Sequence, residues 1–428
     1  MPRLSPHNAE FAIVSFEGPD EYSRAGGLAV RVRDLAETLA GQGFRTHLFF
    51  IGDPNLASVE EQGNLILHRW SQWISAYHPG GVYDGESGKS QDLTASLPPV
   101  LVEEVIRPAA QASRRTIVMG EDWQTVDAMI RLGQLVAGAG LRDVTIPVWT
   151  ANNVFRFTVI DWGLLTAAAH AMTVSRYMKH EMRLFGINPL VAPNGIAPSA
   201  VVDVAPEHSD QLRKAIGADL ALFKIGRFTP DKRWTMALDA VALLNQRGVR
   251  SRIVIRGDRS PYGQDVLARA ANQGLRIVDL TERFTDVPGL AAGLSAHPEA
   301  DVLNLVSFLP DSLLPAMYAS VDAVLANSGH EPFGLVGLEV MGAGGLAFVG
   351  STGEEYAEPE HNAVVLDTDD PLEIVVQLLR LREDTGMVTR LKRRAKETAR
   401  AWTWPAVLPE LLTKLEYVAL ARGVEIST

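Results

Sequence analysis

Cysteine is absent from this chain of 428 residues. Its absence excludes disulfide bonds and metal sites built from thiolates. Long apolar runs are absent as well, since no segment has eighteen uninterrupted apolar residues, and the N-terminal residues lack the apolar core of a signal peptide. We therefore expect a cytoplasmic protein without stable insertion in a membrane.

Positive charge is scarce. The chain has 40 lysine and arginine residues against 51 aspartate and glutamate residues, which gives a net charge of −11. Within the first 200 residues the counts are 16 against 20, so the N-terminal half is not basic either. Nucleic acids and anionic membranes attract basic surfaces, so we expect neither as the main partner. The composition leaves the number of subunits open.

The pattern of apolar residues predicts an α/β protein with two domains. A chain of 428 residues exceeds a usual single core. Short apolar runs alternate with helical patterns, which indicates parallel sheets with crossover helices. A segment dense in proline and glycine, residues 192–206, is typical of a linker between domains 1–200 and 201–404. The expected strands are residues 11–16, 45–51, 116–119, 146–151, 171–175, 222–228, 252–257, 276–280, 302–306, 322–327, 346–350 and 363–367.

Two further segments carry local predictions. Residues 78–96 are rich in glycine and serine and have few apolar anchors, so we expect a mobile surface loop there. Asp367 and Asp369 form an Asp-x-Asp sequence in an acidic stretch, which we interpret as a solvated turn and not as a metal site. No metal site is expected elsewhere.

Two glutamates with seven residues between them, Glu331 and Glu339, form the most informative pattern. The preceding apolar run, residues 322–327, is predicted to be a strand, and residues 334–343 are predicted to be a helix. Glu331 then lies in the loop after the carboxyl end of a strand, where open α/β sheets bind ligands. Carboxylates accept hydrogen bonds from sugar hydroxyls, and backbone amides at a helix start can meet an anion. The loop therefore suits a ligand that is part sugar and part phosphate.

This stretch resembles the Glu-x-x-x-x-x-x-x-Glu signature of retaining glycosyltransferases with the GT-B fold. The likeness is greatest to glycosyltransferase family 4 (group 1), with some likeness to glycogen and starch synthases. The resemblance implies two Rossmann-like, doubly wound domains that face each other across a cleft. In such enzymes an aromatic kink returns the last helix to the N-terminal domain, and Trp402 and Trp404 are similar to that kink. Residues 405–428 are therefore assigned to the N-terminal domain.

A second signature precedes the glutamates by about a hundred residues. In the family an arginine and a lysine after the first strand of the C-terminal domain contact the donor diphosphate, and Arg227 and Lys232 match them in type and order. Thr229 and Pro230 are typical of a helix start, so Lys232 and Arg233 are expected in the first helical turn. The helix dipole disfavours a cation there, and a bound diphosphate would reverse that penalty.

Three loops of the N-terminal half carry partial resemblances. Gly26 and Gly27 match a Gly-Gly-Leu loop that faces the donor phosphate in family 4 enzymes and glucan synthases. Glu121 and Asp122 lie where glucan synthases have His-Asp, and Asp122 is assigned to the acceptor side, with a structural cap as an equal alternative. Asn152 replaces a histidine that contacts the donor sugar near the reacting carbon. An asparagine can hydrogen-bond a hydroxyl but cannot titrate.

The resemblance implies a metal-independent, retaining hexosyltransferase without a cofactor. It would move a hexose from a nucleotide diphosphate sugar to a hydroxyl of a sugar, a glucan or a small molecule. The catalytic residues would be Glu331, Arg227, Lys232 and Asn152. The donor would be bound by Gly26, Gly27, Leu309, Phe333, Gly334, Leu335 and Glu339, with the ribose on Glu339 and the base near Leu309.

Two alternatives remain open: a non-catalytic nucleotide-sugar-binding protein of the GT-B type and a nucleotide-sugar epimerase of the same fold. The sequence does not name the nucleobase, the sugar or the acceptor.

Overall fold

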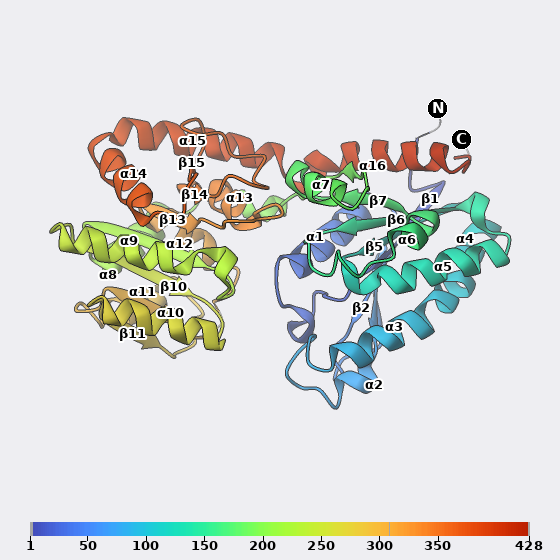
Figure 1. The fold of residues 1–428 in the computed structure, drawn as a ribbon, viewed down its shortest axis with the longest axis horizontal. Coiled ribbons are helices and arrows are strands. Elements are labelled where there is room, and N and C mark those ends of the chain that lie inside the picture. The colour runs from blue at the N-terminus through green and yellow to red at the C-terminus, as the bar shows by residue number, and fades with distance from the viewer. Residues whose placement is uncertain (1–2, 308, 427–428) are drawn as a thin grey trace. The chain divides into compact units, whose positions relative to one another are not determined.

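The protein divides into two compact units. The computed structural model describes residues 3–307 and 309–426. Unit 1 comprises residues 1–195 and 404–428, and unit 2 comprises residues 196–403. The division at 195/196 lies within the predicted linker, a few residues before the expected boundary. Figure 1 shows helices packed around the strands of each unit.

Unit 1 is built on an eight-stranded sheet with the order β3-β4-β2-β1-β5-β6-β7-β8. The strands are β1 (Ala9–Val14), β2 (Thr46–Ile51), β3 (Val59–Gln62), β4 (Leu65–Trp70), β5 (Arg115–Glu121), β6 (Thr145–Ala151), β7 (His170–Thr173) and β8 (Leu190–Val191). All neighbouring pairs are parallel except β3 and β4. The chain winds outward from β1 and then returns to β5 on its other side, so the β1/β5 pair is the point at which the winding reverses.

The helices of unit 1 connect these strands. They are η1 (Glu21–Ser23), α1 (Gly27–Gly41), α2 (Gln72–Ser75), α3 (Glu86–Val100), η2 (Leu101–Ile106), α4 (Arg107–Gln111), η3 (Trp123–Thr125), α5 (Val126–Gly138), η4 (Arg142–Val144), α6 (Trp162–Ala168), α7 (Arg176–Arg183) and α16 (Trp404–Ala421).

The loop predicted for residues 78–96 is wrong over its second half, where α3 begins at Glu86. Few residues of this stretch are apolar, but Leu93 and Leu97 are fully buried, and the Lys89 ammonium donates to the carbonyls of the preceding turn. Tertiary contacts therefore stabilise a helix that the local sequence pattern does not indicate.

Unit 2 is built on a seven-stranded parallel sheet with the order β11-β12-β10-β9-β13-β14-β15. The strands are β9 (Leu220–Ile225), β10 (Ser251–Arg256), β11 (Ile277–Leu280), β12 (Val302–Leu305), β13 (Ala323–Ala326), β14 (Ala347–Val349) and β15 (Val364–Val365). The helices are η5 (Pro198–Ala200), α8 (Pro206–Ile216), η6 (Pro230–Lys232), α9 (Trp234–Gln246), α10 (Pro261–Asn272), α11 (Val287–Ser295), α12 (Leu314–Ser320), α13 (Leu335–Gly342), α14 (Pro371–Glu383) and α15 (Thr385–Ala401). The winding reverses at the β9/β13 pair, as it does at β1/β5 in unit 1.

The two tryptophans near the C-terminus belong to different cores. Trp404 begins α16 and is buried among the apolar side chains of unit 1, together with Leu408, Leu411 and Leu415. Trp402 lies in unit 2, where its ring is 5.7 Å from Phe333 and 6.1 Å from Tyr356. The chain therefore passes from one core to the other within two residues.

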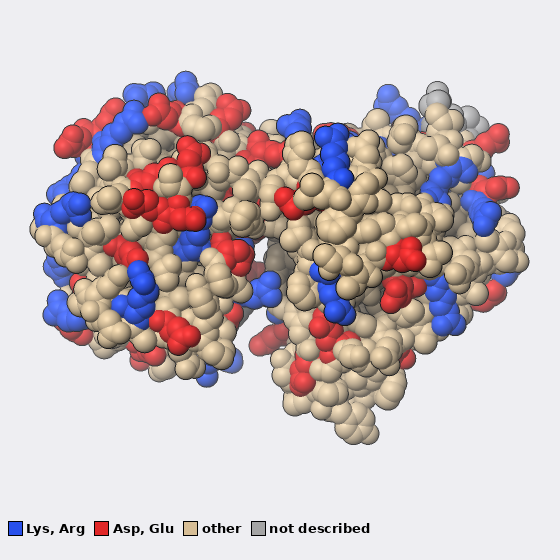
Figure 2. All heavy atoms as spheres, in the orientation of Figure 1, with Lys and Arg blue, Asp and Glu red and all other residues tan. Residues whose placement is uncertain are grey.

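The surface carries mixed charge on the face drawn in Figure 2, where lysine and arginine alternate with aspartate and glutamate over both units. Across residues 3–307 and 309–426, no helix has the length and apolar character needed to cross a membrane.

Candidate functional site

The Arg-Lys and glutamate signatures meet at the β9/β13 pair of unit 2. Leu222 of β9 lies opposite Ala323 of β13, and the two strands run in the same direction. The loop with Arg227 and Lys232 follows β9, and the loop with Glu331 follows β13. Both loops therefore leave the same edge of the sheet, at the position where its winding reverses. Open α/β sheets bind ligands at such positions.

An ion pair joins the two loops. The Lys232 ammonium donates to Glu331 Oε2, although 99 residues separate the two in the chain. A backbone hydrogen bond of 2.7 Å from the amide of Gly329 to the carbonyl of Asp231 runs beside it. The Lys232 side chain is 28% exposed and that of Glu331 is 16% exposed, so a ligand can reach the pair. Arg227 is exposed, and none of the described residues pairs with its guanidinium.

Thr229 and Pro230 begin a helical turn as expected, but the helix does not continue through Arg233. Pro230–Lys232 forms only a single 3-10 turn, and Arg233 adopts a left-handed conformation, with φ of 48°, before α9 begins at Trp234. A turn of three residues has little dipole, so the penalty expected for a cation at Lys232 does not arise. Arg233 instead forms an ion pair of 2.5 Å with Asp369, which is otherwise solvated with 81% of its side chain exposed.

The start of α13 requires glycine. Gly334 has φ of 81° and ψ of 56°, a conformation that other residues rarely adopt. A Cβ atom at this position would lie 2.6 Å from Cγ of Glu354 and 3.2 Å from Cγ of Glu331. The carbonyl of Gly334 accepts a hydrogen bond from the hydroxyl of Tyr356. The loop that follows β14 therefore holds the backbone at this helix start in place.

That loop, residues 350–356, was not among the predicted site residues. The amide of Glu331 donates to Thr352 Oγ1 at 2.8 Å, and the same hydroxyl donates to the Glu331 carbonyl at 3.2 Å. A Cβ at Gly353 would lie 2.1 Å from the Glu331 carbonyl oxygen, so the two loops pack backbone to backbone. A signal exists in the sequence: the loop follows a predicted strand, and the carboxyl ends of parallel strands share one edge.

Glu354 in this loop is buried beside Glu331. Its exposed fraction is 5%, and neither carboxyl oxygen has a hydrogen-bond partner of normal geometry among the described residues. Burial, and then the charge of Glu331, raise the pKa of Glu354 to about 8. The nearby amides of Glu354 and Thr352 and the Lys232 ammonium oppose this shift in pKa without cancelling it.

A buried lysine ties β9 to β13 beneath the loops. Lys224 donates to the Leu325 carbonyl at 3.0 Å and to Asn327 Oδ1 at 2.6 Å, and its ammonium lies 5.0 Å from the Trp234 ring centroid. Burial lowers the pKa of Lys224 well below its ordinary value, and the Lys232 charge adds to the effect. Neither Lys224 nor Asn327 was among the predicted site residues, because the contact between them depends on the order of the strands.

The remaining predicted residues of unit 2 have different environments. Glu339, on α13, accepts a hydrogen bond of 3.2 Å from the Tyr318 hydroxyl. Leu335 is half-buried at the helix start. Phe333 is 2% exposed and Leu309 is 3% exposed, so both side chains pack into the protein and could meet a ligand only through their backbone. Residue 308, which belongs to the loop proposed near the base, lies outside the described residues.

At the β1/β5 pair of unit 1, the helix start is already occupied by a carboxylate. Glu17, in the loop after β1, accepts hydrogen bonds from the amides of Gly26 at 2.9 Å and Ala29 at 3.2 Å. Tyr83 also donates its hydroxyl to Glu17. Gly26 has φ of −167°, an extended conformation open to any residue. A donor phosphate at Gly26 and Gly27 would have to displace or neutralise Glu17.

The two positions that depart from the family motifs contact each other. The Asn152 amide donates to Glu121 Oε2 at 2.8 Å. Glu121 is fully buried and also pairs with Arg31, at 2.9 Å from Nε and 3.2 Å from Nη2. Arg31 in turn donates to Asn194 and lies over the Trp404 ring. The amide nitrogen of Asn152 is therefore engaged within unit 1.

Asp122 is strained and buried. Its φ is 65°, and its side chain caps η3 by accepting from the Trp123 amide at 2.9 Å and from the Asn153 amide group. Burial raises the pKa of Asp122 to about 7, with a smaller contribution from the charges of Glu17 and Glu121. The capping role weighed as an alternative is present, and an acceptor role stays a prediction.

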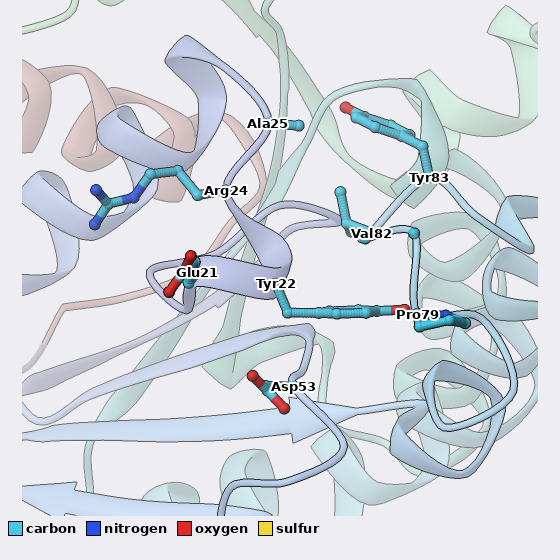
Figure 3. A pocket seen from close by; sticks show the side chains of 10 residues that line it. Glu21, Tyr22, Arg24, Ala25, Asp53, Pro79, Val82 and Tyr83 are labelled. Carbon is cyan, nitrogen blue, oxygen red and sulfur yellow. The ribbon is translucent and has the colours of Figure 1, made fainter. Parts of the chain in front are cut away.

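A pocket of about 470 Å³ opens in unit 1 beside the Gly26 loop. Figure 3 shows the rings of Tyr22 and Tyr83 on opposite sides of it, with Asp53 below and Arg24 pointing away. None of the predicted site residues lines it.

Comparisons with known proteins bear on the fold and on the family likeness. Residues 294–400, which contain both glutamates, match the family described as "Glycosyl transferases group 1". The catalytic domain of starch synthase IV from Arabidopsis thaliana, bound to ADP and acarbose, superposes with a TM-score of 0.70 at 14% identity, over 97% of this chain and 99% of that one. This protein has the GT-B fold, and its residues 294–400 are similar to glycosyl transferases group 1. The fold and the family likeness predicted from the motifs are confirmed.

Two further similar proteins are a solved structure with UDP and glucose and a relative that matches over part of its length. HepE from Anabaena, in complex with UDP and glucose, superposes with a TM-score of 0.64 at 16% identity, over 95% of this chain and 99% of that one. A D-inositol 3-phosphate glycosyltransferase from Salinispora tropica is 30% identical over 193 residues, which are 44% of this chain. The match spans only 36% of the length of that relative.

Proposed function

We propose that this protein is a retaining glycosyltransferase that moves a hexose from a nucleotide diphosphate sugar to an acceptor hydroxyl. The observation that carries the proposal is the Lys232–Glu331 ion pair, because it unites the two family signatures where the sheet of unit 2 reverses its winding. The similarity of residues 294–400 to glycosyl transferases group 1 supports it. The nucleobase and the acceptor are left open, since similar structures hold UDP or ADP.

The chemistry follows from charge. When the sugar leaves, negative charge builds on the diphosphate, and fixed cations that face it lower the barrier. Arg227 is exposed and available for this role, and Lys232 could be shared between the diphosphate and Glu331. Glu331 would hold hydroxyls of the donor sugar, and Glu339 would hold the ribose. The Phe333, Gly334 and Leu335 amides would add contacts at the helix start.

The first experiment is a thermal-shift screen with UDP, ADP and GDP, followed by the matching sugar donors, with and without EDTA. We expect one diphosphate to raise the melting temperature, and its sugar donor to release that diphosphate slowly in the presence of hydroxyl acceptors. Arg227→Ala should weaken diphosphate binding by about 1–3 kcal/mol, the range for a charge-assisted hydrogen bond. Arg393→Ala is a matched control, since Arg393 is exposed on α15 away from the ion pair.

Two outcomes would contradict the proposal: unchanged affinity in Arg227→Ala, or activity that EDTA abolishes. A non-catalytic sugar-nucleotide binding protein is the second candidate, and one observation favours it. The Asn152 amide nitrogen, which the resemblance places at the reacting carbon, is bonded to Glu121. Binding of a sugar nucleotide without any release of diphosphate would support this candidate.

A further inference from the structure

Glu354 is a buried acid that the proposed mechanism does not use. It follows β14, and a Cβ added at Gly334, at the helix start that the donor would meet, would lie 2.6 Å from its Cγ. The same added Cβ would lie 3.2 Å from Glu331 Cγ, so both acids pack close to Gly334. Both oxygens of Glu354 lack a hydrogen-bond partner of normal geometry among residues 3–307 and 309–426, and the residue is only 5% exposed.

The charges near Glu354 do not offset the negative charge that its carboxylate would carry when ionised. The Glu331 carboxylate adds negative charge, and the Lys232 ammonium, the nearest cation, is already paired with Glu331. Tyr356, on the same loop, donates its hydroxyl to Gly334 and not to Glu354. The amides of Glu354 and Thr352 and the Lys232 charge offset burial and the Glu331 charge only in part, so the neutral acid is favoured. Burial raises the pKa of Glu354 to about 8, in agreement with this argument.

We infer that Glu354 makes donor binding depend on a proton: the neutral acid beside Glu331 admits an anionic nucleotide diphosphate sugar, and ionised Glu354 excludes it. The inference rests on the proposed function, since it concerns the donor site of that function. Glu354 is a positioning residue in this scheme. It acts on the charge that the ligand meets and on the Glu331–Lys232 pair, and it does not contact the reacting atoms.

The sign of the effect follows from linkage. An anionic donor favours the protonated form of Glu354, so binding takes up a proton whenever part of the population is ionised. The apparent dissociation constant is the intrinsic constant divided by the fraction in the competent, protonated form. With a pKa of about 8, the native protein should bind the donor about tenfold more weakly at pH 9 than at pH 7. Affinity is therefore lost as the pH rises.

The test is calorimetric titration with UDP-glucose, or with the ADP or GDP sugar that the screen selects, between pH 6.5 and pH 9. The phosphates of a sugar nucleotide do not titrate in this range, so they add no proton uptake of their own. Glu354→Gln keeps the shape of a neutral acid, and we expect its affinity to stay level from pH 7 to pH 9. At pH 8 the native protein should take up about half a proton on binding, measured in buffers of different ionisation enthalpy, and the variant should take up none. Glu358→Gln, at an exposed site in the same segment, should behave like the native protein.

A second readout needs no ligand. The folded-state pKa of Glu354 is raised above its ordinary 4.5, so its contribution to the free energy of unfolding is fully present below pH 4.5 and is lost as the pH rises through about 8. Glutamine does not titrate, so Glu354→Gln should not lose this stability as the pH rises. The stability of the variant relative to the native protein should therefore increase from pH 5 to pH 8.5 in urea denaturation.

Four results would overturn the inference. These are a level affinity in the native protein, an equal alkaline loss in Glu354→Gln, a folded Glu354→Gln that no longer binds at pH 7, and relative stabilities that do not change with pH. If no sugar nucleotide binds at any pH while the stability curves diverge as expected, the proposed function fails and the neutral acid stands. If binding is present but independent of pH, only the inference fails.

Discussion

Charged residues lie at the point where each sheet reverses its winding. The two units differ in how far these charges are paired within the protein. At β1/β5 of unit 1, Glu121 is bonded to Arg31 and Asn152, and Glu17 is bonded to two backbone amides. At β9/β13 of unit 2, one partly exposed ion pair, Lys232–Glu331, joins the loops, and Arg227 is exposed. The unit 2 edge also contains Glu354 with both oxygens unpartnered among the described residues.

This contrast indicates a division of labour between the two edges. A cluster in which each charge has a protein partner holds elements together and has little capacity left for a ligand. A cluster with an exposed cation and an unpaired acid is less stable by itself and gains from a ligand that completes it. We therefore expect substitutions in unit 1 to reduce stability and those in unit 2 to reduce binding or turnover.

The largest expected effect is on stability and comes from Arg31 in unit 1. Replacing Arg31 with methionine leaves the fully buried Glu121 carboxylate without its cation and removes the contact with Trp404. Loss of one partner of a buried pair typically costs about 3–5 kcal/mol. Urea denaturation of Arg31→Met measures the change in free energy of unfolding.

Arg107→Met is the control, because Arg107 pairs with Glu103 on an exposed helix surface where such pairs contribute about 0.5 kcal/mol or less. If the two variants lose equal stability, the cluster at β1/β5 is not the closed structural unit described above.

The next effect is on turnover and separates the two glutamates of unit 2. Glu331→Gln should lower kcat by about a hundredfold or more, the scale for losing one preorganised polar group. Binding of the free nucleoside diphosphate should stay nearly intact, because the proposed partner of Glu331 is the sugar. Steady-state kinetics and nucleotide titrations of the same preparation provide the two measurements.

Glu339→Gln serves as the matched variant in the same signature. Its proposed partner is the ribose, so it should weaken binding of the nucleotide itself, by about 1 kcal/mol for one hydrogen bond. Equal losses of both properties in both variants would mean that the glutamates support the fold and do not divide sugar from ribose.

A smaller effect on turnover than that of Glu331→Gln is expected at Asn152, where a catalytic and a structural role are both possible for unit 1. Asn152→Ala should lower kcat at least tenfold, which corresponds to about 1.4 kcal/mol of transition-state stabilisation. Because its amide also bonds Glu121, the free energy of unfolding must be measured beside the rate. A variant with near-native kcat and reduced stability would place Asn152 in the structural cluster. The native pH–rate profile should show no step from this position, since asparagine does not titrate.

The apolar pattern located most of the buried strands, with the exception of β4, in which Leu65, Ile66 and Leu67 are buried. The twelve expected strands are all present with shifted ends, whereas β3, β4 and β8 were not anticipated. β3 is largely exposed and polar, and β8 has only two residues, so neither has a recognisable apolar pattern. The helix at Thr229 was expected on good local grounds, and the left-handed Arg233 overrides them.

The sequence by itself determined the alternation of strands and helices, the spacing of Glu331 and Glu339, and the placement of Arg227 and Lys232 after a strand. Each of these depends on residues close together in the chain, which periodicity and motif spacing report. Only the tertiary structure decided which side chains meet. Lys232 reaches Glu331, Asn152 reaches Glu121, and the buried Glu354 oxygens lack a hydrogen-bond partner among the described residues. The strand order is the cause, because it places β9, β13 and β14 side by side and β5 next to β6. Contacts over such sequence separations follow from packing of the whole sheet, and no local pattern encodes them.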